Sequence, residues 1–420
     1  MAEAFSFLFL AMLAATTGLR VWLALRQMRH VSAHREAVPA EFADRIPLAD
    51  HRKAADYTNA KLRLGLTELA ADVALLLLFT HGGLLAAFAA FWQGHFAAGS
   101  HLYGLALFAS VGIAGFLLGL PFSLYRTFRL EARFGFNKMT LGLYVADLVK
   151  QLILTVLIGA PLLLLVLWLM DAMGPRWWLT VWMTWLAFNM LVMWLYPTVI
   201  APLFNKFSPL AEGEVKTRIE ALLARCGFAS SGLFVMDGSK RSAHGNAYFT
   251  GFGRAKRIVF FDTLIDKLAP GEVEAVLAHE LGHYKRRHIV KRIVVMSVLS
   301  LALLWLLGQL IDQPWFYAGL QVGSGAAAPD TAMALILFSL VLPVFTFPLG
   351  PLMSWHSRRH EFEADAYAAQ QASGSDLIAA LVKLYRDNAA TLTPDPLHSL
   401  FYDSHPPASQ RIAHLRSLAT

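Results

Sequence analysis

Seven long apolar stretches constrain this chain more than any other feature of its sequence. A helix needs about 20 residues to cross a bilayer. Seven segments of the 420 residues meet this length: Phe5–Leu25, Thr67–Phe91, Leu102–Tyr125, Leu152–Met170, Trp178–Ile200, Ile289–Leu310 and Thr331–Trp355. One such stretch could be a buried core helix, but seven together predict an α-helical integral membrane protein. The charged fraction of 15%, against about 25% in soluble domains, argues against a purely soluble enzyme.

Basic residues gather in alternate loops between these stretches. The segment 26–63 carries eight Lys or Arg residues, the segment 126–150 carries five, and two more follow the last stretch at 358–359. The intervening loops carry Arg176 or no basic residue. Because basic loops stay in the cytoplasm, we expect the N-terminus outside and the C-terminus inside. This distribution explains the net charge of +7 without nucleic acid.

Two smaller features narrow the class of protein further. The single cysteine, Cys226, excludes an internal disulfide and a multi-cysteine metal site. The first stretch has Glu3 before it and no basic region, so we expect no cleaved signal peptide.

Two long polar segments, 201–288 and 356–420, both fall on the predicted cytoplasmic side. Together they could form one soluble domain of about 150 residues. Their patterns predict two helices and three short strands. The helices are Glu212–Cys226 and Glu272–Arg287, and the strands are Gly232–Met236, Ala247–Phe252 and Arg257–Phe261.

The second predicted helix contains a metal-binding pattern. The run His279-Glu280-Leu281-Gly282-His283 places two His on one helical face, so both imidazoles can bind one metal ion. Glu280 can take a proton from metal-bound water and pass it to a leaving amine. The metal would lower the pKa of that water towards about 7 and polarise the scissile carbonyl. An accidental pair of His on a helix is the alternative.

A third ligand is expected from the segment after the last stretch. Glu361 and Asp365 are four residues apart and share a helical face, whereas Glu363 points elsewhere. Glu361 can bind the metal while Asp365 orients a ligating His. The alternative is a solvated acidic helix start. Two membrane spans separate His283 from Glu361, so both lie on the same side of the membrane, near its surface.

These residues resemble the type I CAAX prenyl endopeptidases, a family of integral-membrane zinc metalloproteases with seven spans around a chamber. The resemblance runs from about residue 120 to the end and includes further motifs in order. They are Leu120–Ser123, Gly135–Asn137, Tyr196–Pro197, Pro202–Phe207, Gly238–Ser242, Asn246–Phe249, Arg257–Val259, Phe261–Leu264, Ser404–Pro407 and Arg411. It implies seven transmembrane helices around a chamber and a cytoplasmic α+β gluzincin-type domain.

The resemblance also implies roles for particular residues. His279, His283 and Glu361 look like the ligands of one zinc ion per chain, and Glu280 like the catalytic base. His405 looks like a catalytic histidine that steadies the oxyanion. The remaining residues are implied to bind substrate, with an edge strand at Asn246 that holds the peptide: Asn246, Ala247, Tyr248 and Arg411. His288, five residues after His283, faces elsewhere and receives no ligand role.

The chain accordingly divides into four parts. Spans one to five occupy 1–200, the edge strand and metal helix occupy 201–288, spans six and seven occupy 289–355, and the third ligand follows in 356–420. Usage rich in Ala and Arg suggests a bacterial inner-membrane protein with its active site towards the cytoplasm. We expect a monomer that contacts the bilayer and a peptide or membrane-protein substrate, which the family resemblance suggests is prenylated.

Three other functions are kept as alternatives. A membrane-protein quality-control protease would share the chemistry without prenyl specificity. A seven-span transporter or receptor would hold a structural metal, which requires four protein ligands. An intramembrane-cleaving protease would need the His pair inside a span, and the charges of Lys285, Arg286 and Arg287 oppose this.

Overall fold

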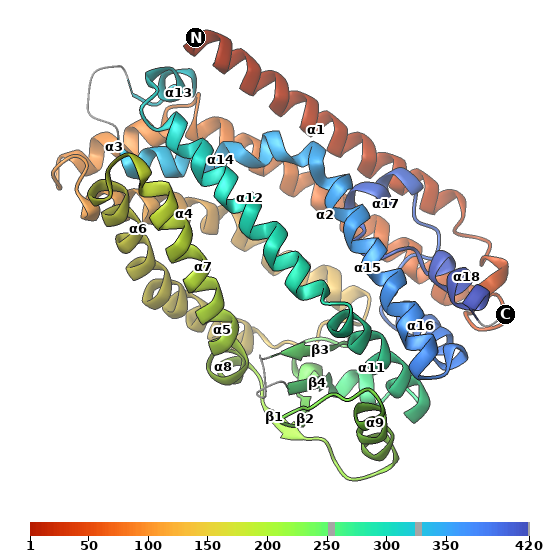
Figure 1. Cartoon of the computed structure of the whole chain (residues 1–420). Helices are drawn as coiled ribbons and strands as arrows, with labels where there is room; N and C mark the ends of the chain where they lie inside the picture. Colours follow the sequence, from red (N-terminus) through yellow and green to blue (C-terminus); the bar gives the residue numbers. More distant parts are fainter. Residues whose placement is uncertain (251–256, 324–329, 419–420) are drawn as a thin grey trace.

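Long helices make up most of the molecule, and a small sheet lies at one end of them (Figure 1). The computed structural model describes residues 1–250, 257–323 and 330–418. The N-terminus, α3 and α13 lie at the end opposite the sheet (Figure 1). The helices of the apolar part are α1 (Ala2–Ala33), α2 (Leu48–Phe79), α3 (Leu84–Gln93), α4 (His101–Tyr125), α5 (Leu141–Leu154), α6 (Ala160–Ala172), α7 (Trp177–Leu195), α8 (Ala201–Phe204), α12 (His288–Leu310), α13 (Pro314–Gly319), α14 (Thr331–Thr346) and α15 (Gly350–Gln371).

The predicted membrane architecture is confirmed. Among the described residues, six helical segments are long and apolar enough to cross a membrane, and α2 with α3 makes a seventh if that bent pair is one span. Three of the segments continue through π-helical turns at 126–131, 155–159 and 196–200 instead of breaking there.

The second span differs from its prediction. We expected one continuous helix over Thr67–Phe91, but α2 ends at Phe79 and α3 begins at Leu84, with a bend of 49° between them. Gly83 lies in the break with a φ of 75°, a backbone conformation that glycine adopts at little cost. The prediction of one unbroken helix was therefore wrong, because apolar composition does not reveal a turn inside an apolar segment.

The last apolar segment is much longer than a bilayer requires. α14, a short turn and α15 form one segment, Thr331–Gln371, of 41 residues. At 1.5 Å per residue this is roughly 60 Å of helix, against about 30 Å for the hydrocarbon core. α15 therefore extends beyond the apolar part towards the end that carries the sheet (Figure 1).

Four short strands form the sheet in the order β1 (Phe207–Pro209), β2 (Leu233–Met236), β4 (Arg257–Phe261) and β3 (Ala247–Thr250). The β2–β4 pair is parallel and the other two pairs are antiparallel. The three predicted strands are present, β1 was not predicted, and residues 251 and 252 of the predicted third strand lie outside the described residues. Among the described strands, β3 lies at the edge of the sheet, as expected.

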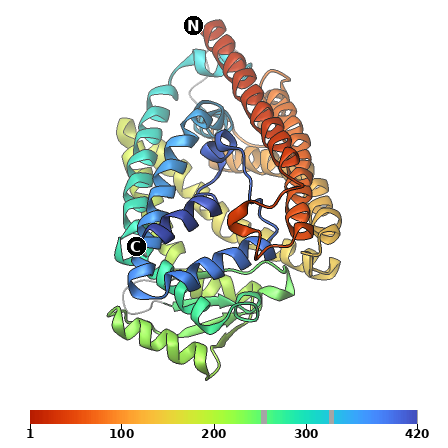
Figure 2. The ribbon, with the colours of Figure 1, turned by 90° about the vertical axis from the view of Figure 1, so that its right-hand side faces the viewer.

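The two polar segments share one hydrophobic core. Ile219, Phe260 and Leu281 from the first segment cluster with Leu377 and Leu415 from the second. The C-terminal helices are seen between α1 and α12 (Figure 2). The remaining helices of this part are α9 (Glu214–Arg225), α10 (Asp262–Ile265), α11 (Pro270–Lys285), α16 (Gly374–Asp387), α17 (Pro396–Tyr402) and α18 (Ala408–Leu418).

A largely buried ion pair joins the membrane helices to the sheet. Arg241, which follows β2, donates to both carboxylate oxygens of Asp147 on α5, at 2.8 and 2.9 Å. It also donates to Asn205 Oδ1 at 2.9 Å. The two charged side chains are 19% and 9% exposed. The Lys138 N–H donates to the Arg241 carbonyl at 3.1 Å, so the loop after α4 is fastened at the same point.

Removal of the Asp147 carboxylate should destabilise this junction. Asp147→Ala leaves the Arg241 guanidinium without its counter-charge, a loss of about 3 kcal/mol for a buried pair. We expect the thermal unfolding midpoint of the detergent-solubilised protein to fall by several degrees, and the double variant with Arg241→Met to recover part of that loss. Glu214→Ala, which breaks an exposed pair with Arg218 on α9, is the control and should change the midpoint little. If Asp147→Ala and Glu214→Ala gave equal unfolding midpoints, the Asp147–Arg241 pair would not stabilise this junction.

Candidate metal centre

α11 and α15 lie closely against one another where the candidate ligands sit. Gly282 permits this approach, since a Cβ at its position would lie 2.8 Å from the Ala364 Cα and 3.0 Å from the Ala364 carbonyl oxygen. α11 begins at Pro270, and the Glu272 carboxylate accepts the Ala269 N–H at 2.7 Å. This bond satisfies a backbone donor at the helix start and fixes where the helix begins.

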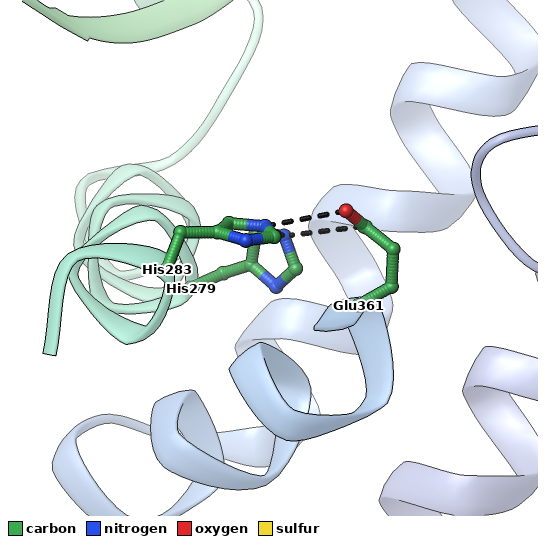
Figure 3. Close-up of side chains that lie close together, drawn as sticks. All are labelled: His279, His283 and Glu361. Atoms are coloured by element: carbon green, nitrogen blue, oxygen red, sulfur yellow. Dashed lines mark hydrogen bonds and ion pairs between the residues drawn. The ribbon is translucent and has the colours of Figure 1, made fainter. Parts of the chain in front are cut away.

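His279 and His283 on α11 face Glu361 on α15 (Figure 3). The Nε2 atoms of the two His lie 3.2 Å apart. His279 Nε2 is 3.5 Å from Glu361 Oε2, and His283 Nε2 is 3.2 Å from Glu361 Oε1. One ligand atom from each residue lies within 4.8 Å of the other two. The structure thus brings together the three residues that the sequence proposed as ligands.

These three residues fit a metal ion. Glu361 Oε2 is buried and has no aligned hydrogen-bond donor among the described residues, although His405 Nδ1 lies 2.7 Å away. A buried carboxylate oxygen without such a partner is costly, and a cation would satisfy it. Two nitrogens and one carboxylate leave a fourth position open, which is typical of catalytic rather than structural zinc sites.

Asp365 contacts the ring nitrogen of His279 that points away from Glu361. His279 Nδ1 lies 2.8 Å from Asp365 Oδ1, so Nε2 is the nitrogen turned towards Glu361. Asp365 is fully buried, and Arg411 donates to its two oxygens at 2.8 and 2.5 Å. A carboxylate in this position fixes the ring orientation and tautomer of a ligating histidine. Asp365 lies where the sequence placed it.

Arg411 lies in a different environment from the one expected. We expected it to bind substrate, but its side chain is only 7% exposed. Besides Asp365, it contacts His279 Nδ1 at 3.3 Å and Glu361 Oε2 at 3.7 Å. Its donors are therefore directed at residues of the candidate centre itself, which favours a positioning role over substrate binding. No pattern near Arg411 in the sequence signals this contact.

His288 supports His283 in the same way. The expectation that His288 faces away from His283 was wrong, because α11 ends at Lys285 and Arg287 turns the chain with a φ of 56° before α12 begins. His288 Nδ1 lies 2.9 Å from His283 Nδ1, and its Nε2 lies 3.0 Å from Glu363 Oε2. His288 is 1% exposed. Regular helical spacing could not have predicted this contact.

Carboxylates control the protonation of His279. Burial and the Arg411 charge lower its pKa, whereas the neighbouring carboxylates of Asp365 and Glu361 raise it, and the resulting pKa is about 9. Metal ions bind the neutral imidazole. Metal binding at neutral pH would therefore displace a proton from His279.

Glu280 and His405 lie beside the three ligands. Glu280 follows His279, is half-buried and forms no ion pair with any described residue. His405 is 62% exposed, and its Nδ1 lies 2.7 Å from Glu361 Oε2. The Tyr385 hydroxyl donates to the Pro406 carbonyl at 3.4 Å and so holds the loop that contains His405. Burial raises the pKa of Tyr385 to about 12, which keeps this donor protonated.

The expected substrate-binding residues Asn246, Ala247 and Tyr248 lie at the start of the edge strand. The Asn246 carbonyl accepts the Phe261 N–H at 3.0 Å, so the alternation of an antiparallel ladder turns the backbone groups of Ala247 away from β4. Asn246 Oδ1 accepts the Ala247 N–H at 2.8 Å. Because β3 packs against α11, the edge that could accept an extended peptide lies beside the metal-binding helix.

A cavity of about 570 Å³ opens beside His405. Residues of α1, α2 and α16 and the loop after α17 line it, among them Arg20, Lys61, Tyr385 and His405. Its volume lies within the range of small-molecule sites, roughly 300–1,000 Å³. The structure therefore places an open cavity between membrane helices and the loop that carries His405.

Two family models match the chain. The model for the CAAX prenyl protease N-terminal region, with five membrane helices, matches residues 27–206. The model for peptidase family M48 matches residues 209–419.

Similar proteins and a similar structure share this organisation. CAAX prenyl protease 1 homolog of Oryza sativa subsp. japonica is 38% identical over 75% of this chain and 73% of its own length. CAAX prenyl protease 1 of Saccharomyces cerevisiae is 37% identical over 71% of this chain and 69% of its own length. The crystal structure of S. mikatae Ste24p superimposes with a TM-score of 0.91 at 31% identity, covering 98% of this chain and 99% of the other. The two named relatives are eukaryotic, so they give no support to the bacterial origin expected from composition.

Loss of the His288 hydrogen bond should weaken metal binding. His288→Phe keeps the ring that stacks on His360, 3.9 Å between centroids, but removes the contact with His283 Nδ1. We expect metal affinity to fall about 10- to 100-fold, measured by competition with a chromogenic chelator. His34→Phe, in the exposed loop after α1, is the control. Unchanged affinity in His288→Phe, with an unchanged unfolding midpoint, would show that His288 does not orient His283.

Proposed function

This chain belongs to the CAAX prenyl protease 1 family within peptidase family M48, and we propose that it removes the C-terminal tripeptide of prenylated CAAX proteins with one zinc ion. The family makes the protein a multi-pass integral-membrane metalloendopeptidase that acts on peptide or prenylated protein substrates. The identity of the metal, the residue roles, the orientation in the membrane and the monomeric state belong to the proposal.

The single observation that carries the proposal is the convergence of His279, His283 and Glu361 within 4.8 Å. A set of two imidazoles and one carboxylate suits zinc, and the open fourth position suits catalysis. The same openness disfavours a transporter or receptor with a structural metal, which would close the site with a fourth protein ligand. We also assign peptidase chemistry to 201–288 and 356–420, and membrane anchoring to 1–200 and 289–355.

The chain's own residues supply the remaining chemistry. A bound zinc would act as a Lewis acid and lower the pKa of its water towards about 7. Glu280 would serve as the base that takes a proton from the attacking water and passes it to the leaving amine. His405, exposed beside Glu361, donates to the oxygen that becomes negative as the carbonyl is attacked. Asn246 and the edge of β3 hold the peptide extended beside α11.

The active site is assigned to the cytoplasmic side. The basic loops 26–63 and 126–150 both contact the part of the molecule that carries the site: Phe42 packs against Ile412, and Lys138 is bonded to Arg241. Basic loops favour the cytoplasm, so the centre is expected there, close to the membrane surface. The assignment to a bacterial inner membrane stays a prediction.

Glu280→Gln should abolish cleavage while metal is retained. The amide has the size of the carboxylate but cannot accept the proton, and general-base catalysis contributes about 10²- to 10⁴-fold. We expect the rate on a farnesylated CAAX peptide to fall by at least about 100-fold, with metal content unchanged by elemental analysis. Glu212→Gln on the exposed surface is the control. Wild-type cleavage by Glu280→Gln would refute the proposed base.

The requirement for a prenyl group separates the two protease functions. Purified wild-type protein should cleave a farnesylated CAAX peptide faster than its unprenylated twin, because burial of each lipid CH₂ contributes about 0.8 kcal/mol. The measurement is kcat/KM for each peptide in the same detergent. Equal values would favour a quality-control protease without prenyl specificity.

A further inference from the structure

We propose that the cavity beside His405 binds the C-terminal carboxylate of the substrate through Lys61 and Arg20. The inference rests on the proposed function, because a carboxylate reaches this cavity only if cleavage occurs close to a chain end. It assigns a binding site and two specificity residues on α1 and α2, outside the residues that surround the metal.

Arg20 and Lys61 are charged residues on helices of the apolar part. Arg20 lies inside the predicted span Phe5–Leu25, and α1 packs along α2, which carries Lys61. Both residues line the cavity. A charge within a membrane helix is costly and normally faces a bundle interior or a water-filled space where it has a function. Arg20 is such a charge, and Lys61, from the basic segment 26–63, adds a second cation to the same cavity, which favours an anionic occupant.

Neither cation forms an ion pair with a described residue. The Lys61 ammonium lies 4.1 Å from the centroid of the Tyr57 ring, and the Arg20 guanidinium lies 5.6 Å from that of Phe347. Aromatic faces attract cations but do not neutralise them. Glu131, whose charge acts on Lys61, is engaged by the Tyr57 hydroxyl at 2.6 Å.

Two other cations in this part of the chain are paired with carboxylates. Arg26 is paired with Asp395 at 2.8 Å, and Arg35 with Asp56 at 2.8 Å. Asp403 lines the same cavity, but it stands two residues before His405 in the chain, at the catalytic end. Arg20 and Lys61 have no such carboxylate partner among the described residues and line the cavity, so they are available to an anion from outside the chain.

The cavity also suits the apolar part of a short peptide tail. Leu62, Leu66 and Leu69 line it together with the two cations. A tripeptide spans about 10 Å when extended, and a volume of about 570 Å³ is in the usual range for such a ligand. Since the cavity begins at His405, a peptide cut at the metal can place its last residues along the leucines and its carboxylate on Lys61 and Arg20. Hydrogen bonds between ionised partners are the strongest that this tail can make.

The test compares two farnesylated CAAX peptides that differ only in the C-terminus, a free acid or an amide. Wild-type protein should show a kcat/KM at least about tenfold higher for the acid. Lys61→Met should lose most of this preference while its rate on the amide is unchanged, and Lys61→Met with Arg20→Met should lose all of it. Lys61→Arg should keep it. Lys53→Met, on the same helix but outside the cavity lining, is the matched control.

The outcomes separate this inference from the proposed function. Equal kcat/KM for acid and amide in wild-type protein would overturn the carboxylate site and leave the peptidase intact. Equal slowing of both peptides by Lys61→Met would also overturn it, because a charge contact must discriminate between them.

If wild-type protein cleaves neither peptide, the proposed function fails. A binding measurement then tests the carboxylate site on its own. The tripeptide Val-Val-Leu should bind Glu280→Gln protein at least about tenfold more tightly than its amide. That difference should vanish when Lys61→Met is added. Equal binding of the two tripeptides would overturn the inference.

Discussion

The close contact between α11 and α15 is the constraint on which the rest of the centre depends. The proposed ligand set is divided between these helices, with two imidazoles on one and a carboxylate on the other. Only a residue without a side chain permits this distance, since a Cβ at Gly282 would lie 2.8 Å from the Ala364 Cα. Gly282 therefore matters as much for packing as the proposed ligands matter for chemistry. Because α15 continues α14, the same contact ties the metal site to a membrane helix.

Around this contact, each histidine ligand has its own support. The Nδ1 atom of His279 contacts Asp365, to which Arg411 donates a hydrogen bond. The Nδ1 atom of His283 contacts His288. Because both rings present Nε2 to Glu361, their other nitrogens must be bonded to fix that orientation. The supports come from four separate elements, α11, α12, α15 and α18, so the geometry of the centre depends on the folding of the whole C-terminal half. The ion pair between Asp147 and Arg241 fastens the membrane helices to the same assembly.

Local patterns predicted much of this molecule, and their failures have physical causes. Apolar length and loop charge identified the membrane architecture, and the i, i+4 spacing of His279 and His283 pointed to the helix that carries the candidate metal centre. The break between α2 and α3 was missed because a turn can lie within an apolar run. His288 was excluded because helical spacing was extended past Arg287, where the backbone turns. Arg411 was assigned to substrate because nothing local shows that its guanidinium reaches Asp365.

The sequence by itself determined that the chain enters a membrane, which segments stay polar, and which residues bear metal-binding chemistry. These properties depend on composition and on spacing within one element, and both can be read along the chain. Only the tertiary structure decided how residues 82 to 132 positions apart meet, as His279 does with Glu361 and Arg411. It also decided that Lys61 and Arg20 share a cavity with His405. Such contacts depend on helix packing, which short-range patterns do not encode.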